Sequence, residues 1–300
     1  MRDDRELQLD WDFRPLHDAW PAGPDSAYMM RRLAAVPVEA TAAGASGRLL
    51  EVAAAEAVHA CRLNRLGLTS VVLEPSMAML GLARQRMREH GAALELVRGV
   101  CETLPFRDAS FDRVLCDSAI DHFADPAEGV REMARVLRPG GRLVISANNY
   151  AGVAVRVSRA LYRLARLLRL PGSERHFFWD TPVPAEHTFE CTFARLEQLC
   201  GPHLELDHAF GVSLGGMAPG WGALLARLPA GWAQALLERL DRVAFRAPRA
   251  ADFMVTVWRP RADGRLAPRA SVAATGYVVA PDDLVYPAQA QREAHWAALA

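Results

Sequence analysis

Short apolar runs alternate with amphipathic stretches through the first half of the chain. The apolar runs lie at residues 48–53, 70–74, 94–98, 111–116 and 142–147. Between them, residues 55–66 and 76–90 carry apolar side chains at helical spacing, and a third such stretch begins at 125–128 and stops at 139–141 (PGG). Strands separated by helices of this length predict βαβ units and a parallel sheet.

The second half is less regular, and its clearest feature is a basic amphipathic helix over residues 152–170. Its apolar face holds Val153, Val157, Leu161, Leu164 and Leu168, and its polar face holds Arg156, Arg159, Arg163, Arg166 and Arg169. We favour a solvated helix that covers the sheet edge. A lid that brings arginine to an anionic acceptor and association with a membrane surface are the alternatives.

Further elements complete the pattern. A short helix is expected over 193–200, strands over 203–210 and 253–258, and a helical hairpin broken at Pro229 over 221–245. No internal repeat is found in the sequence.

These elements suggest a division of the chain into three parts. Residues 1–46 are expected to form an N-terminal extension that covers the site, and residues 261–300 a C-terminal tail. Residues 47–260 form the main domain, in which insertions at about 150–190 and 215–250 build a helical cap.

Composition narrows the function classes. A hydrophobic fraction of 51% in 300 residues excludes global disorder. The formal net charge is zero, which argues against wholesale binding of nucleic acid. All 35 basic residues are arginine, so Schiff-base lysine chemistry and a phosphate-binding P-loop lysine are excluded.

Cysteine usage and the N-terminal residues indicate the compartment. The five cysteines are odd in number and form no CxxC pair, so a reducing cytoplasm is expected. The charged N-terminus does not have the form of a signal peptide. No stretch approaches the roughly 18 apolar residues of a membrane span, so stable insertion is not expected and surface association would use residues 152–170.

Residues 97–146 resemble the central region of class I S-adenosylmethionine (SAM) dependent methyltransferases. The resemblance rests on residues 104–106 (LPF), 110–112 (SFD) and 135–141 (RVLRPGG), in this order. The similarity is to the small-molecule type 11 enzymes, such as those of quinone biosynthesis. It implies a Rossmann-like α/β sandwich whose mostly parallel seven-stranded sheet has an antiparallel last strand near 253–258. It also implies SAM as cofactor and a small methyl acceptor, which is expected to be apolar. A homodimer is a separate option, with residues 261–300 as one possible source of its contacts.

The resemblance places the cofactor after the strands, where open α/β sheets bind ligands. Glu74 is expected to accept the ribose hydroxyls and Glu51 to meet the ammonium group, because carboxylates form charge-assisted hydrogen bonds with such donors. The expected cofactor-binding residues are Glu51, Ala53, Ala55, Glu74, Pro75, Val100, Cys101 and Asp117. A dinucleotide-binding domain is the nearest alternative, but its G-x-G-x-x-G glycines are absent.

Two features depart from the family pattern. Ala53, Ala55 and Ala57 stand where the family has glycines, and alanine in a positive-φ conformation costs roughly 1–2 kcal/mol. Val100 stands where related sequences have an acid that accepts from the adenine amino group. Because of these departures, the alternative remains that the protein has lost methyl transfer and serves as a binding subunit or a repurposed enzyme. A nicotinamide-linked oxidoreductase is a weaker alternative.

Candidate catalytic residues follow the fourth strand. His122 is the first choice of general base, with Asp121 to orient it or to take the role itself; a helix cap or surface pair is the alternative. His187 is the second choice. The spacing of Cys191, Cys200, His203 and His208 matches no zinc pattern, so no metal site is expected.

Overall fold

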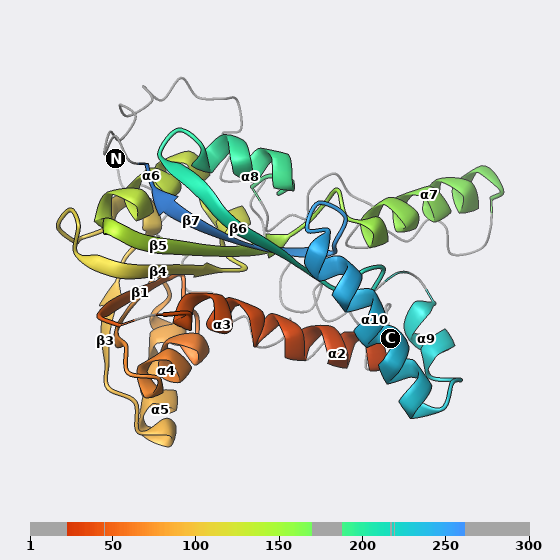
Figure 1. The fold of residues 1–300 in the computed structure, drawn as a ribbon, viewed down its shortest axis with the longest axis horizontal. Coiled ribbons are helices and arrows are strands. Elements are labelled where there is room, and N and C mark those ends of the chain that lie inside the picture. Colours follow the sequence, from red (N-terminus) through yellow and green to blue (C-terminus); the bar gives the residue numbers. More distant parts are fainter. Residues whose placement is uncertain (1–22, 45, 170–187, 217, 219, 262–300) are drawn as a thin grey trace.

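The computed structural model describes residues 23–44, 46–169, 188–216, 218 and 220–261, and contains a seven-stranded sheet (Figure 1). The strands are β1 (Arg48–Val52), β2 (Thr69–Glu74), β3 (Leu94–Arg98), β4 (Phe111–Asp117), β5 (Leu137–Asn148), β6 (Leu204–Val212) and β7 (Phe253–Pro260). Their spatial order is β3-β2-β1-β4-β5-β7-β6. Each of the strands β1 to β5 pairs in parallel with its neighbours among them, and β7 runs antiparallel to both β5 and β6. The expected class of fold, including the antiparallel last strand, is confirmed.

One boundary was wrong. The sequence pattern ended the helix after β4 at the PGG of residues 139–141, but that helix ends at Val136 and β5 already begins at Leu137. Phe111 pairs with Leu137 before the register shifts, and Arg113 pairs with Arg142. Residues 137–141 therefore extend the sheet through an irregularity instead of capping the helix.

Helices cover both faces of the sheet (Figure 1). They are α2 (Pro24–Leu33), α3 (Val36–Ala42), α4 (Val58–Arg65), α5 (Met77–His90), α6 (Pro126–Val136), α7 (Val153–Leu167), α8 (Phe193–Cys200), α9 (Trp221–Leu225) and α10 (Ala230–Arg246). Apolar side chains of α6 and α8 join one large core with β1, β4 and β5. Side chains of α2, α3 and α4 share a second core with the opposite face of the same sheet.

The described part of the predicted N-terminal extension belongs to the body of the domain. Val36 and Val38 of α3 are buried with Leu49, Leu115 and Val144 of the sheet. Helix α2 in turn contacts the α9–α10 hairpin, where Asp241 accepts hydrogen bonds from Tyr28 Oη at 3.3 Å and Arg32 Nε at 2.7 Å. Residues 24–42 are therefore a layer of the fold, and residues 1–22 lie outside the described part.

The favoured interpretation of residues 152–170 is confirmed in part, because the helix is solvated but does not cover the sheet edge. Only Ala154, Val155 and Ser158 of α7 are buried, and all three lie in its first two turns. Beyond them the helix leaves the body instead of covering the sheet edge (Figure 1). Its exposed positions are taken up again below.

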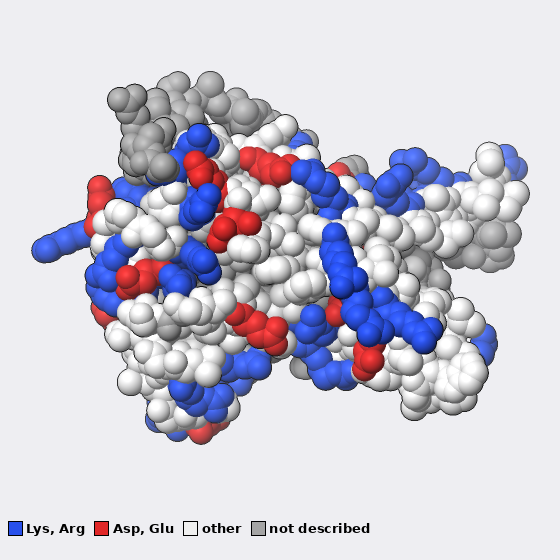
Figure 2. All heavy atoms as spheres, in the orientation of Figure 1, with Lys and Arg blue, Asp and Glu red and all other residues white. Residues whose placement is uncertain are grey.

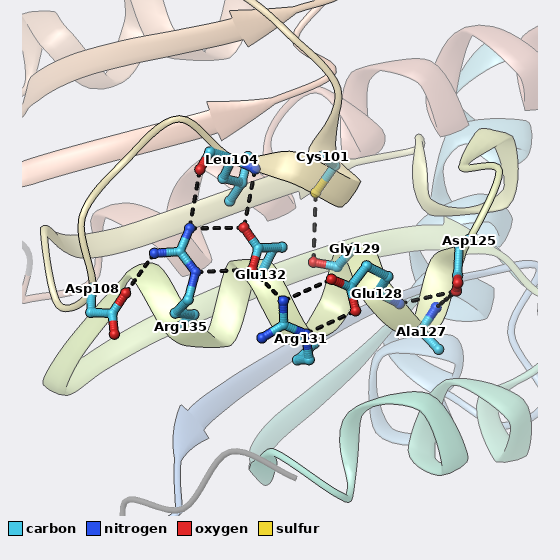
Figure 3. Close-up of polar contacts among 10 residues, drawn as sticks. All are labelled: Cys101, Leu104, Asp108, Asp125, Ala127, Glu128, Gly129, Arg131, Glu132 and Arg135. Carbon is cyan, nitrogen blue, oxygen red and sulfur yellow. Dashed lines mark hydrogen bonds and ion pairs between the residues drawn. The ribbon is translucent and has the colours of Figure 1, made fainter. Parts of the chain in front are cut away.

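The motif that carries the family resemblance forms a polar network around α6 (Figure 3). Arg135 and Glu132 pair at 2.8 Å, and Glu132 accepts the backbone N–H of Leu104 at 3.1 Å. Arg135 also donates to the carbonyl of Leu104 and to Asp108. These contacts fix the loop between β3 and β4 onto α6, so the motif residues position the site without entering it.

Candidate functional site

Three carboxylates stand at the carboxyl ends of neighbouring parallel strands. Glu51 is the second-last residue of β1, Glu74 is the last residue of β2 and Asp117 is the last residue of β4. These three strands are adjacent in the sheet. The side chains are near enough that Asp117 and Glu74 both act electrostatically on Glu51. The topology therefore gathers negative charge at the edge where the sequence predicted a cofactor.

The loop after β1 has the positive φ angles typical of glycine, although alanine occupies these positions. Ala53, Ala55 and Ala57 have φ angles of 49°, 47° and 57°, all in the left-handed region that favours glycine. Ala57 is the residue that precedes α4. The backbone route of a glycine-rich loop is thus kept, at an expected cost of roughly 1–2 kcal/mol for each strained alanine.

Glu74 ties this loop to the sheet. Its carboxylate accepts the backbone N–H of Ala55 at 2.8 Å and that of Ser76 at 2.9 Å. Burial raises the pKa of Glu74, and these two hydrogen bonds oppose that rise. The carboxylate is held in one orientation and keeps acceptor capacity for further donors, as the ribose hydroxyls expected from the family would require.

Glu51 is the most deeply buried of the three acids. It is 2% exposed, and its Oε2 accepts the backbone N–H of Ala60 at 2.7 Å. Burial raises its pKa to about 7, with the negative charge of Asp117 adding to the rise and His59 opposing it. A cationic ligand nearby would favour the ionised form of this carboxyl group.

Asp117 is held by a residue that sequence reasoning missed. His59 Nε2 lies 3.0 Å from Asp117 Oδ2, and Ser146 Oγ donates to Asp117 Oδ1. Burial opposes a charge on His59, but the hydrogen bond and charge of Asp117 and the charge of Glu51 outweigh it and raise its pKa. The available signal was a histidine in the first turn of the helix after β1, close to the ends of the neighbouring strands.

The loop after β3 only partly matches expectation. Val100 is half-buried at the start of a short helical turn, Cys101–Thr103. The Cys101 thiol is buried and donates to the Gly129 carbonyl at 3.6 Å, so it points into the core toward α6. The carbonyl of Pro75 accepts from Arg98 Nε at 3.0 Å. Of these residues, Val100 stays a candidate for the adenine pocket, and the side chain of Cys101 does not.

The candidate base lies just beyond β4. Asp121 and His122 belong to a helical turn, Ile120–His122, in which Asp121 is buried and His122 is half-buried. The backbone carbonyl of Asp121 accepts the N–H of Thr188 at 2.7 Å, which draws the segment before α8 to this edge. His187 lies outside the described residues. The two catalytic candidates thus stand at the same edge of the sheet as the carboxylates.

Metal chemistry finds no support in the described residues. Cys191, Cys200 and His203 are buried, and the described part of the chain holds no group of three or more His, Cys, Asp or Glu side chains arranged to bind a metal ion. Among the helices that the structure describes, none combines the length and apolarity of a membrane span.

The curated proteins that resemble this chain include methyltransferases. A family model described as a methyltransferase domain matches residues 50–145. Demethylmenaquinone methyltransferase of Mycobacterium sp. (strain KMS) is 35% identical over 132 residues, which cover 44% of this chain and 54% of the relative. The enzyme of the same name from Deinococcus radiodurans is 46% identical over 67 residues, 22% of this chain and 28% of the relative. The chain spans about half the length of the first of these relatives.

Solved structures share the fold at low sequence identity. The PH0226 protein of Pyrococcus horikoshii OT3 has a TM-score of 0.53 at 18% identity and covers 83% of this chain and 100% of its own. The [4+2]-cyclase SpnF has a TM-score of 0.50 at 20% identity and covers 76% of this chain and 79% of its own. The sheet order and these structures show a Rossmann-like class I methyltransferase fold, and the similarity to the methyltransferase domain family covers residues 50–145.

Proposed function

We propose that the chain is a cytoplasmic SAM-dependent methyltransferase that acts on a small, apolar molecule. The observation that carries the proposal is the convergence of Glu51, Glu74 and Asp117 at the carboxyl ends of β1, β2 and β4. The relatives named demethylmenaquinone methyltransferase support an acceptor of the quinone kind. A protein of this fold that has lost methyl transfer is the alternative, and the family match does not favour it.

The residues present fit a cationic methyl donor. SAM supplies a methyl group on a sulfonium ion and also carries an ammonium group, and three carboxylates are the chemical complement of such charges. Glu74 is fixed by two backbone N–H groups, and Asp117 is fixed by His59 and Ser146, so neither has to reorganise when a ligand binds. Ala53, Ala55 and Ala57 keep the left-handed backbone path that the family's glycines would take.

His122 and Asp121 are proposed to handle the proton of the acceptor. Methyl transfer to a hydroxyl group or an acidic carbon needs a general base close to the nucleophile. His122 takes that role because its helical turn follows β4 directly, next to Asp117. Asp121, buried beside it, orients the imidazole.

Calorimetric titration of the whole chain with SAM, and separately with S-adenosylhomocysteine, tests the cofactor. We expect dissociation constants in the micromolar range, which correspond to about −8 kcal/mol. Glu74→Gln is expected to abolish binding, whereas Glu95→Gln, an exposed acid on the neighbouring β3, leaves it unchanged. Absence of binding to the unaltered chain at millimolar ligand would contradict the proposal and favour the alternative.

The base is tested once an acceptor has been found by screening small quinols. His122→Ala is expected to lower kcat about 100-fold or more, with the affinity for SAM unchanged. A smaller loss in Asp121→Asn fits a positioning role. An unchanged kcat in both variants would remove this pair from the mechanism.

A further inference from the structure

Helix α7 presents an apolar stripe that the body of the protein does not cover. Val157, Leu161, Leu164 and Leu168 are spaced by four, three and four residues, which places them on one side of the helix. They are 43%, 47%, 50% and 58% exposed, and Leu167 is 79% exposed. The residues that do pack against the body, Ala154, Val155 and Ser158, lie on a different side of the helix. The exposed stripe is therefore separate from the side of α7 that packs against the described body of the protein.

The start of the helix is anchored while the rest projects. The N–H of Ala154 donates to Asp252 Oδ1 at 3.2 Å, and the N–H of Val153 donates to the carbonyl of Ala250 at 2.9 Å. From this anchor α7 extends away from the sheet (Figure 1). The stripe is therefore held on a rigid base at the outside of the molecule.

The charge on α7 identifies the kind of partner. Residues 153–169 contain five arginines and no acidic residue. Arg159 pairs with Glu190 at 2.5 Å, and Arg156, Arg163, Arg166 and Arg169 are exposed. Figure 2 shows basic side chains along this projecting end. A partner must offer an apolar phase and, beside it, a layer of negative charge.

We propose that α7 docks on the surface of an anionic lipid bilayer, with the leucine stripe in the acyl boundary and the arginines at the headgroups. A bilayer supplies both layers in the order that the helix presents them. A second copy of the chain that apposed the same face would bring the exposed arginines of two helices together, and residues 153–169 hold no acidic residue to offset them. The inference stands independently of methyl transfer.

Sedimentation of the full chain with vesicles tests the proposal. We expect binding to phosphatidylcholine vesicles that contain phosphatidylglycerol, weakening with salt, and little binding to phosphatidylcholine alone. Arg163→Gln and Arg166→Gln are each expected to weaken binding about fivefold. The double variant Leu161→Glu/Leu164→Glu is expected to lose about tenfold or more. Leu66→Glu, at an exposed leucine directly after α4, is the matched control and binds as the unaltered chain does.

Two results would overturn the proposal. One is the absence of sedimentation of the unaltered chain with phosphatidylglycerol vesicles. The other is binding that survives the double leucine substitution while circular dichroism shows a folded protein. Analytical ultracentrifugation of the unaltered chain and of the double leucine variant tests the competing occupant. If the unaltered chain is a dimer, the double substitution dissociates it and neither protein binds vesicles, the stripe belongs to a contact with a second copy of the chain.

Discussion

At the scale of single residues, the loop after β1 stores strain that glycine would relieve. Ala55 has φ of 47° and belongs to none of the apolar clusters, so its methyl group contributes little packing. A left-handed alanine costs roughly 1–2 kcal/mol, which substitution by glycine would relieve. The greater entropy of glycine in the unfolded chain offsets about 0.5–1 kcal/mol of this relief.

Ala55→Gly is therefore expected to raise the free energy of unfolding by about 0.5–1 kcal/mol, measured by urea denaturation. Ala54→Gly, in the same loop but without a positive φ and packed against α4 and α5, is the control and is expected to destabilise by about 1 kcal/mol. Equal effects of the two substitutions would show that the loop is not strained.

Burial of Glu51 makes stability depend on pH. Its pKa is about 7 in the folded protein and 4.5 in the reference state, because burial disfavours its charge. Below pH 4.5 the group is protonated in both states and costs nothing. Between pH 4.5 and 7 the unfolded chain loses this proton first, so the contribution of Glu51 to stability falls as pH rises, by about 3 kcal/mol in all.

Glu51→Gln should remove this dependence. The variant is expected to match the unaltered protein near pH 4 and to exceed its stability by up to about 3 kcal/mol near pH 8, in denaturant titrations at both pH values. Glu89→Gln, at an exposed acid on α5, is the control with no such divergence. A stability difference that stays constant across this range would contradict a raised pKa at Glu51.

At the scale of elements, the fold depends on how α6 holds the loop between β3 and β4. Glu132 and Arg135 are 7% and 16% exposed, and together they satisfy both backbone groups of Leu104. Removal of one member of a buried pair leaves the other uncompensated.

Glu132→Gln is expected to lower the free energy of unfolding by about 2–3 kcal/mol, because Arg131 and Arg135 both lose the charge of Glu132 and the other carboxylate beside Arg135, Asp108, is exposed. Glu238→Gln, which also removes a carboxylate from a helix but at an exposed site on α10, should change it by less than about 0.5 kcal/mol. Urea denaturation compares the two, and equal losses would show that the network adds no stability.

At the scale of the whole molecule, stability is unevenly distributed. Strand β4 lies in the middle of the sheet with both faces covered, whereas the second half of α7 buries none of its residues. Local opening is easiest where few apolar contacts are broken.

Native-state hydrogen exchange is expected to show this difference. The amides of Tyr162–Leu167 should exchange about 100-fold or more faster than those of Val114–Cys116. The amides of α10, a helix of similar length that packs on β6 and α2, serve as the comparison. Equal protection in α7 and β4 would mean that α7 is covered in solution.

The sequence by itself determined the element order and the parallel sheet, because strand and helix periods and turn residues are local signals. The antiparallel last strand and the roles of Glu51 and Glu74 were expected only from the family resemblance. The same locality explains the error at β5, where PGG reads as a helix stop although strand pairing decides its conformation. Only the tertiary structure revealed the His59–Asp117 pair, the turning of Cys101 into the core, and the exposure of the α7 stripe. An amphipathic pattern states which side of a helix is apolar, but whether another layer covers that side depends on contacts between residues far apart in the chain.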